Sequence, residues 1–393
     1  KLAQAHIHLA QWFRVRRNLP ASHTPRASGL LLAPYRSPIR LADAQRKAGS
    51  GRTEEARAAM AEILKHAPDY LPAILVQARL ETQERKFDQA LALTTRVLAR
   101  DPFSLETRQL RTQLYAAKGE PEKAVIEWEQ FDKDLPGNPL IKSQLAQAYL
   151  ANSEAAKAGT AAEQAIRLSS NRLDVLDIQS RLLRARADLE TQNPAGAVEV
   201  LRTLLTRTNV IEGRLLLVDA FRAAGKMDDA IATSRALARD IPENARLPVM
   251  LGMLERERGR SADAKTAFRR SLELSPGNLM AMYQIVDLEL AATNAPAALK
   301  LVEAELARTN SAPLRYLQGR AFSAQKQWPQ AEQAFRQSLE LNPDFSLSYQ
   351  SLAQVYLANT NLAGAAKELE GLVSRRTNDL ASAVVLATVY ERL

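Results

Sequence analysis

Apolar residues recur at steps of three and four along most of the chain, with polar residues between them. One stretch has Leu145, Ala148 and Tyr149 in its first half and Ala158 and Ala161 in its second. This spacing places the apolar side chains on one face of an α-helix. The pattern therefore predicts successive short amphipathic helices, and it predicts no strands.

The helical pattern repeats with a period of about 34 residues. Two stretches are nearly the same, "FRRSLELSPGN" at 268–278 and "FRQSLELNPDF" at 335–345. An alanine returns once per period throughout, at Ala56, Ala90, Ala124, Ala158, Ala197, Ala230, Ala264, Ala298, Ala331 and Ala365. We call these the central alanines. The step between Ala158 and Ala197 is 39 residues, which indicates an insertion near 173–210.

Other residue types keep a fixed distance from the central alanine. Twelve residues before it stands a small residue in most repeats, at Ala44, Ala78, Ala146, Ala185, Gly252, Gly319 and Ala353. Five residues before it glycine recurs, at Gly51, Gly119, Gly225 and Gly259. Small residues let two helix backbones approach closely, and glycine suits the left-handed residue that ends a helix. Each repeat is thus expected to be two helices joined by a tight turn.

An aromatic residue nine positions before the central alanine and a proline twelve positions after it complete the pattern, as in Tyr149 and Pro276. In unit length and in these marks, residues 37–393 resemble the tetratricopeptide repeat. The resemblance implies an all-α fold, an α-solenoid of stacked antiparallel helix pairs wound as a right-handed superhelix. We expect about ten full repeats and a partial C-terminal one, with a longer, irregular repeat near 173–210.

Composition agrees with a helical array. Hydrophobic residues make up 46% of the 393 residues but aromatic residues only 5%, which suits close helix packing by Ala and Leu. The chain has no cysteine, so a disulfide framework and a sulfur-based zinc site are excluded. No apolar run reaches the length of about 18 residues that a membrane span needs.

The net charge of +9 is concentrated at one end of the chain. Residues 1–47 hold nine basic residues and one acidic residue, so the rest is almost neutral. This argues against nucleic acid as a partner of the array. Residues 1–36 are interpreted as a degenerate helix followed by a basic linker that is partly disordered. An arm that contacts anionic lipid or nucleic acid stays an alternative to a plain linker.

The two ends suggest that the sequence is part of a longer protein. Residue 1 is not Met, no signal-peptide pattern is present, and the last segment matches a first helix without its partner. We expect at least one further helix in the natural protein. The compartment stays open between the bacterial periplasm or cell envelope and the cytoplasm.

The sequence offers little for catalysis. Its four histidines do not have the spacing of metal ligands, and no phosphate-binding glycine motif occurs. An S-x-x-K match at Ser323 lacks the companion motifs of its enzyme class. We therefore predict that the protein is not an enzyme and uses no cofactor or metal.

Binding is favoured instead, because the family resemblance implies a concave groove lined by the first helices. The residues predicted to bind a partner there are Arg181, Arg184, Arg222, Arg256, Tyr283, Tyr316 and Arg320. Arginine offers a planar fork of donors for carboxylates. The hypothesis is a protein or peptide partner, extended and acidic. The alternative is an ordinary solvated surface with scattered ion pairs.

These observations predict a non-enzymatic scaffold for protein–protein interaction. In style the repeats are similar to those of long bacterial tetratricopeptide proteins of polysaccharide export and PEP-CTERM systems, which implies a role in envelope or exopolysaccharide assembly. A second hypothesis is the substrate-recruiting arm of a larger enzyme, such as a glycosyltransferase or sulfotransferase. A third is a regulatory protein whose basic N-terminal arm binds nucleic acid.

Overall fold

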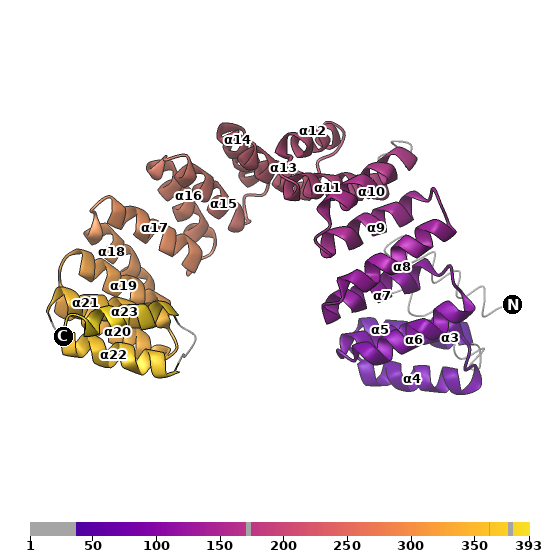
Figure 1. Cartoon of the computed structure of the whole chain (residues 1–393), viewed down its shortest axis with the longest axis horizontal. Helices are drawn as coiled ribbons and strands as arrows, with labels where there is room; N and C mark the ends of the chain where they lie inside the picture. The colour runs from indigo at the N-terminus through magenta and orange to yellow at the C-terminus, as the bar shows by residue number, and fades with distance from the viewer. Residues whose placement is uncertain (1–36, 170–173, 361, 376–379) are drawn as a thin grey trace. The chain divides into compact units, whose positions relative to one another are not determined.

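The computed structural model describes residues 37–169, 174–360, 362–375 and 380–393, and all regular structure within them is α-helical (Figure 1). The expectation for residues 1–36 lies outside these residues. The chain divides into two compact units, residues 1–200 and 201–393. Along each unit the helices alternate as the first and second helix of successive repeats.

Unit 1 stacks consecutive helix pairs whose members run antiparallel (Figure 1). Its first helices are α3 (Ser37–Gly49), α5 (Leu71–Gln83), α7 (Leu105–Lys118), α9 (Pro139–Ala151) and α11 (Val175–Glu190). Its second helices are α4 (Thr53–His66), α6 (Phe87–Arg100), α8 (Pro121–Asp134) and α10 (Ala155–Leu168). The next helix along the chain is α12 (Pro194–Leu205), in which the division between the units falls.

Unit 2 continues the same alternation. Its first helices are α13 (Ile211–Ala223), α15 (Arg246–Glu257), α17 (Leu279–Ala291), α19 (Ala312–Ala324) and α21 (Ser346–Ala358). Its second helices are α14 (Met227–Asp240), α16 (Ser261–Leu274), α18 (Ala295–Leu306), α20 (Trp328–Leu341) and α22 (Leu362–Arg375), and α23 (Leu380–Tyr390) packs against α22. The prediction of an all-α solenoid of helix pairs is confirmed.

The central alanines lie where the two helices of a repeat pack together. All ten are at most 3% exposed. In two repeats the small residue of the first helix is a glycine that faces a ring of the second helix. A Cβ atom on Gly319 would lie 2.6 Å from the ring of Phe335, and one on Gly252 would lie equally close to Phe268. The small positions in the sequence pattern thus make room for buried rings.

The turn inside each repeat uses one left-handed residue, five positions before the central alanine. Glycine fills it in four repeats, as the sequence pattern predicts. In the other six repeats the residue with positive φ has a side chain, at Arg85, Ser153, Gln192, Thr293, Lys326 and Thr360. The repeat therefore imposes this backbone conformation even where the residue type disfavours it.

Several neighbouring repeats are joined by a polar contact from the position nine before the central alanine. Glu81 at this position is buried and contacts Arg57 of the preceding second helix at 2.6 Å. In another repeat the polarity is reversed, and the Tyr149 hydroxyl donates to Glu129 of the preceding second helix at 2.6 Å. In these repeats the first helix is fixed to the helix before it by a complementary pair.

Candidate functional site

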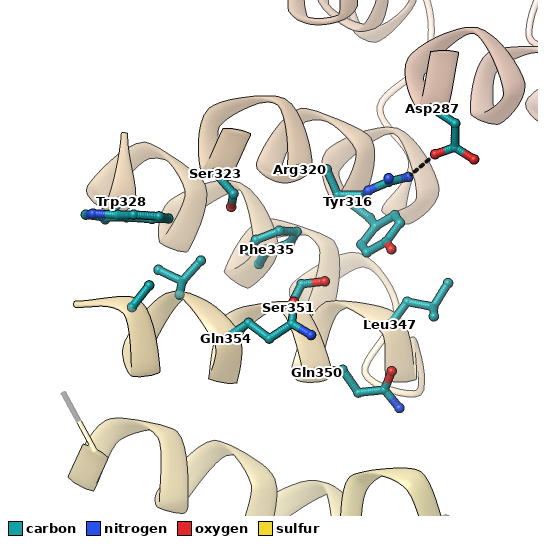
Figure 2. A pocket seen from close by; sticks show the side chains of 12 residues that line it. Asp287, Tyr316, Arg320, Ser323, Trp328, Phe335, Leu347, Gln350, Ser351 and Gln354 are labelled. Carbon is teal, nitrogen blue, oxygen red and sulfur yellow. Dashed lines mark hydrogen bonds and ion pairs between the residues drawn. The ribbon is translucent and has the colours of Figure 1, made fainter. Parts of the chain in front are cut away.

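The first helices α17, α19 and α21 of unit 2 build the candidate site. Two positions of the repeat project from each of them, fifteen and eleven residues before the central alanine. They carry Tyr283, Tyr316 and Gln350 at the first position, and Asp287, Arg320 and Gln354 at the second. A cavity of about 610 Å³ opens between α19 and α21, and Figure 2 shows the side chains around it. Its lining comprises Asp287, Tyr316, Arg320, Ser323, Trp328, Phe335, Leu347, Gln350, Ser351, Gln354, Val355 and Ala358.

Aromatic rings hold the wall of this cavity in place. The ring of Tyr316 lies 5.9 Å from that of Phe335 and 5.6 Å from that of Phe345, measured between centroids. Tyr283, one repeat earlier, lies 6.1 Å from Tyr316. Because buried rings in mutual contact have few alternative rotamers, this wall is ordered before any ligand arrives.

One ion pair stands at the mouth of the cavity. Arg320 Nη1 donates to Asp287 Oδ1 at 2.7 Å, from α19 to α17 (Figure 2). The guanidinium carbon also lies 5.8 Å from the centre of the Tyr316 ring. Both charged side chains stay about 30% exposed. The pair uses one N–H group of Arg320, and its other donors have no partner among the described residues.

Burial raises the pKa of the Tyr283 hydroxyl to about 12, with the neighbouring Tyr316 adding to the effect and Arg320 opposing it. Tyr283 is therefore uncharged at neutral pH and can both donate and accept hydrogen bonds. The amides of Gln350 and Gln354 extend the same surface along α21 without adding charge (Figure 2). This arrangement can hold a polar backbone beside apolar side chains.

Two of the predicted binding residues, Arg181 and Arg184, lie on α11 in unit 1. Arg181 Nε contacts Asp177 Oδ2 at 3.0 Å, and that carboxylate is fully buried. Arg184 Nε contacts Asp188 at 3.0 Å, and its Nη1 contacts Glu163 of α10 at 3.3 Å. Both arginines therefore bind carboxylates of their own unit, and neither lines the cavity of unit 2.

Arg222 and Arg256 lie on α13 and α15 of unit 2, outside the cavity. Arg222 Nε contacts Glu257 of α15 at 2.7 Å. Arg256 donates to the side chain of Gln284 on α17. Each arginine thus links its first helix to the next one. Of the seven predicted residues, the structure brings together Tyr283, Tyr316 and Arg320.

Sequence reasoning missed several lining residues, and one of them had a usable signal. Asp287 stands eleven residues before Ala298, as Arg320 stands eleven before Ala331. Lining up the repeats by the central alanine would have placed these opposite charges side by side. Ser351 and Leu347 had no comparable signal, because their roles depend on how α21 turns toward α19.

A second cavity, of about 450 Å³, lies among α8, α9 and α10 of unit 1. It is lined by charged residues that already pair with one another. Lys142 contacts Asp132 at 2.6 Å, and Tyr149 donates to Glu129. We regard it as the weaker candidate, because its charges serve the contact between repeats.

No group of three or more histidine, aspartate or glutamate side chains in the described ranges could hold a metal ion. None of the helices in that part of the chain is long and apolar enough to cross a membrane.

The helices are stacked in pairs, and first helices of unit 2 line a cavity. These features define a helical-repeat protein with a candidate binding surface. Models of the tetratricopeptide repeat match residues 47–114, 249–313 and 316–381, together about half of the chain. The chain belongs to the tetratricopeptide repeat family. Such repeats form scaffolds that bind protein partners, and proteins of this family are generally non-catalytic.

Solved structures are similar to this chain at low sequence identity. Yeast Tom70 is 12% identical over 99% of this chain and 88% of its own, with a TM-score of 0.44. A tetratricopeptide repeat protein from Parabacteroides merdae is 13% identical over 67% of this chain and 98% of its own, with a TM-score of 0.42. In the structure of Naa15/Naa10 bound to HypK-THB, a chain is 16% identical over 100% of this chain, with a TM-score of 0.36. This chain covers 66% of that one, just under two thirds of its length. No curated protein matches the sequence.

Proposed function

We propose that the protein binds an extended segment of a partner protein across α17, α19 and α21. The observation that carries this proposal is the cavity between α19 and α21, where a wall of ordered rings meets a half-exposed ion pair. Its volume of about 610 Å³ is large enough for one or two side chains of a peptide. The glutamines of α21 supply donors and acceptors for the backbone of the bound segment.

An acidic residue in the bound segment is part of this proposal. The free N–H groups of Arg320 form a fork that matches a carboxylate, and charge-assisted hydrogen bonds of this kind are among the stronger ones. Such a contact leaves the pairing of Arg320 with Asp287 in place. The other predicted arginines lie outside the cavity and contact side chains of this chain.

A peptide selection tests the proposal. Random 12-residue peptides displayed on phage are selected on the intact protein, and the affinities of the enriched peptides are measured by fluorescence anisotropy. Gln354→Trp places a large ring in the cavity from an exposed position and should abolish binding. Arg320→Ala should weaken binding about tenfold, which corresponds to about 1.4 kcal/mol.

The matched control is Arg270→Ala, which removes an arginine that pairs with Glu273 on the outer face of α16. It should leave peptide affinity unchanged. Peptides that bind Gln354→Trp as tightly as the wild type would place their site elsewhere and contradict the proposal.

We place this binding activity in bacterial cell-envelope or exopolysaccharide assembly. The support is the Ala-, Leu- and Arg-rich style of the repeats, as in "AFRRSLELSPGN". The competing proposal is the substrate-recruiting arm of a larger glycosyltransferase or sulfotransferase. Terminal-peptide mass spectrometry on the natural full-length protein separates the two. A signal segment and more repeats favour the scaffold, and a long non-repetitive extension favours the enzyme arm.

A further inference from the structure

We propose that the bound segment carries one acidic and one basic residue, about two positions apart, and that the site reads their order along the segment. The acidic residue faces Arg320 and the basic residue faces Asp287. This inference rests on the proposed function, because it assumes a segment that lies across α17, α19 and α21. It adds a requirement on the order of the two charges along the segment, which a preference for acidic segments would not include.

The first step is the equivalence of the two positions. Asp287 and Arg320 stand at the same place in successive repeats, each eleven residues before its central alanine. Gln354 holds that place in the next repeat. A segment that crosses the three first helices in turn therefore meets a negative, a positive and a neutral side chain in fixed order.

The two charged groups contact each other at 2.7 Å, so the acid and the base of a ligand face a single ion pair and must lie close together. Side chains two positions apart lie on the same face of an extended chain, which advances about 3.3 Å per residue. The two ligand residues are therefore about two positions apart.

The two charged side chains are only partly paired and partly exposed. Of the described residues that line the cavity, Asp287 and Arg320 are the charged ones. Asp287 Oδ1 accepts from Arg320, while its Oδ2 has no partner in the described part of the chain. Both side chains are about 30% exposed, so each can take a second charged partner from the solvent side.

Possible ligands differ in how their charges interact with Arg320 and Asp287. A segment with only acidic residues is attracted by Arg320 and repelled by Asp287, a few ångströms away. A segment with only basic residues meets the reverse. A segment that carries both charges in the matching order gains from each, and in the reversed order it is repelled at both.

The experiment exchanges the two charges. The double variant Asp287→Arg/Arg320→Asp keeps the net charge and can re-form the internal ion pair. Peptides are selected as above on the wild type and on this variant. We expect base and acid to be enriched about two positions apart on both proteins, in opposite order. Exchanging the two charges within one selected peptide should weaken its binding to the wild type at least tenfold and strengthen its binding to the variant.

The same charge order on both proteins would overturn the inference while leaving the proposed function intact. If the proposed function itself is wrong, the selected peptides will bind Gln354→Trp as tightly as the wild type. If the double variant does not fold, as judged by circular dichroism, Asp287→Asn and Arg320→Gln replace it. In Asp287→Asn, replacing the basic residue of the peptide by Gln should no longer weaken binding. In Arg320→Gln, replacing the acidic residue of the peptide by Gln should no longer weaken binding. If both replacements weaken binding to these variants as much as to the wild type, the inference is contradicted.

Discussion

At the scale of single residues, the fold depends on pairs whose sizes match. Gly319 and Phe335 form one such pair, and Gly252 and Phe268 form the other. Both rings are essentially unexposed. The size of one side chain therefore limits the other in these two repeats.

Gly319→Ala should destabilise the protein by about 1–3 kcal/mol, because the added methyl group would overlap the Phe335 ring. The free energy of unfolding in urea measures the change. The control is Gly371→Ala in α22, where nothing lies within 4 Å of the added atom. There the helix should gain about 0.5–1 kcal/mol. A loss of stability in the control would point to an effect of alanine unrelated to the ring.

Tyr283 should make stability fall at alkaline pH. Its native pKa of about 12 exceeds the ordinary value of 10, so the folded protein holds a proton that the unfolded chain has released. The contribution of this group is complete below pH 10 and is lost as the pH rises toward 12. Urea midpoints at pH 8, 10, 11 and 12 should fall less steeply for Tyr283→Phe than for the wild type. Parallel curves would mean that Tyr283 ionises normally in the folded protein.

The central alanines could be predicted from the sequence because close helix packing accepts few residue types there. The charged partners could not. Arg222 and Arg256 look like free donors in the sequence, but their contacts with Glu257 and Gln284 depend on which neighbouring helix each side chain reaches. Long side chains have several rotamers, and the packing of the next repeat selects among them.

At the scale of helices, consecutive repeats are matched by polarity as well as by shape. Glu289 on α17 is buried and meets Lys265 of α16 at 3.1 Å and Arg269 at 3.3 Å. At the equivalent position of α21, the Tyr356 hydroxyl donates to Glu332 of α20 at 2.8 Å. A carboxylate therefore faces cations, and a tyrosine faces a carboxylate.

Arg57→Glu should destabilise unit 1 by about 1–3 kcal/mol or more, because it places a second carboxylate beside the buried Glu81. The double variant Arg57→Glu/Glu81→Tyr should recover most of this loss, since it imitates the pair of Glu332 and Tyr356. Urea denaturation of wild type, single and double variants measures both steps. No recovery in the double variant would show that the two positions are not matched as a pair.

Helix pairs and their turns followed from the sequence, because the apolar period and the glycines mark them. The longer α11 was suggested by the inserted residues, and it spans 16 residues where α9 and α13 span 13. The turns without glycine could not be recognised from residue type. Their left-handed residues, such as Thr293, adopt that conformation because the packing of the two helices constrains the backbone of the turn between them.

At the scale of the whole molecule, every described contact between helices joins neighbours or next neighbours along the chain. Stability in such an array is close to a sum over repeats and their interfaces. A local defect should therefore weaken the repeats around it and leave distant ones nearly unchanged.

Two tryptophans allow this to be measured. Trp128 is buried in α8, and Trp328 begins α20. Ala331→Leu overpacks the repeat of Trp328 and should lower its stability by about 1–3 kcal/mol. In variants that keep one reporter each, with Trp12 also replaced by Phe, the urea midpoint should fall for Trp328 and stay nearly constant for Trp128. Equal shifts would mean that the chain unfolds as one cooperative block.

The site of unit 2 takes one side chain at a time from successive repeats, and this has an evolutionary consequence. Insertion of one duplicated repeat between Asp287 and Arg320 would separate the two charges in one genetic event. A compact domain would need coordinated point mutations for the same change. Relatives of this chain can therefore acquire new binding preferences by altering repeat number, while each repeat keeps the residues that hold its own two helices together.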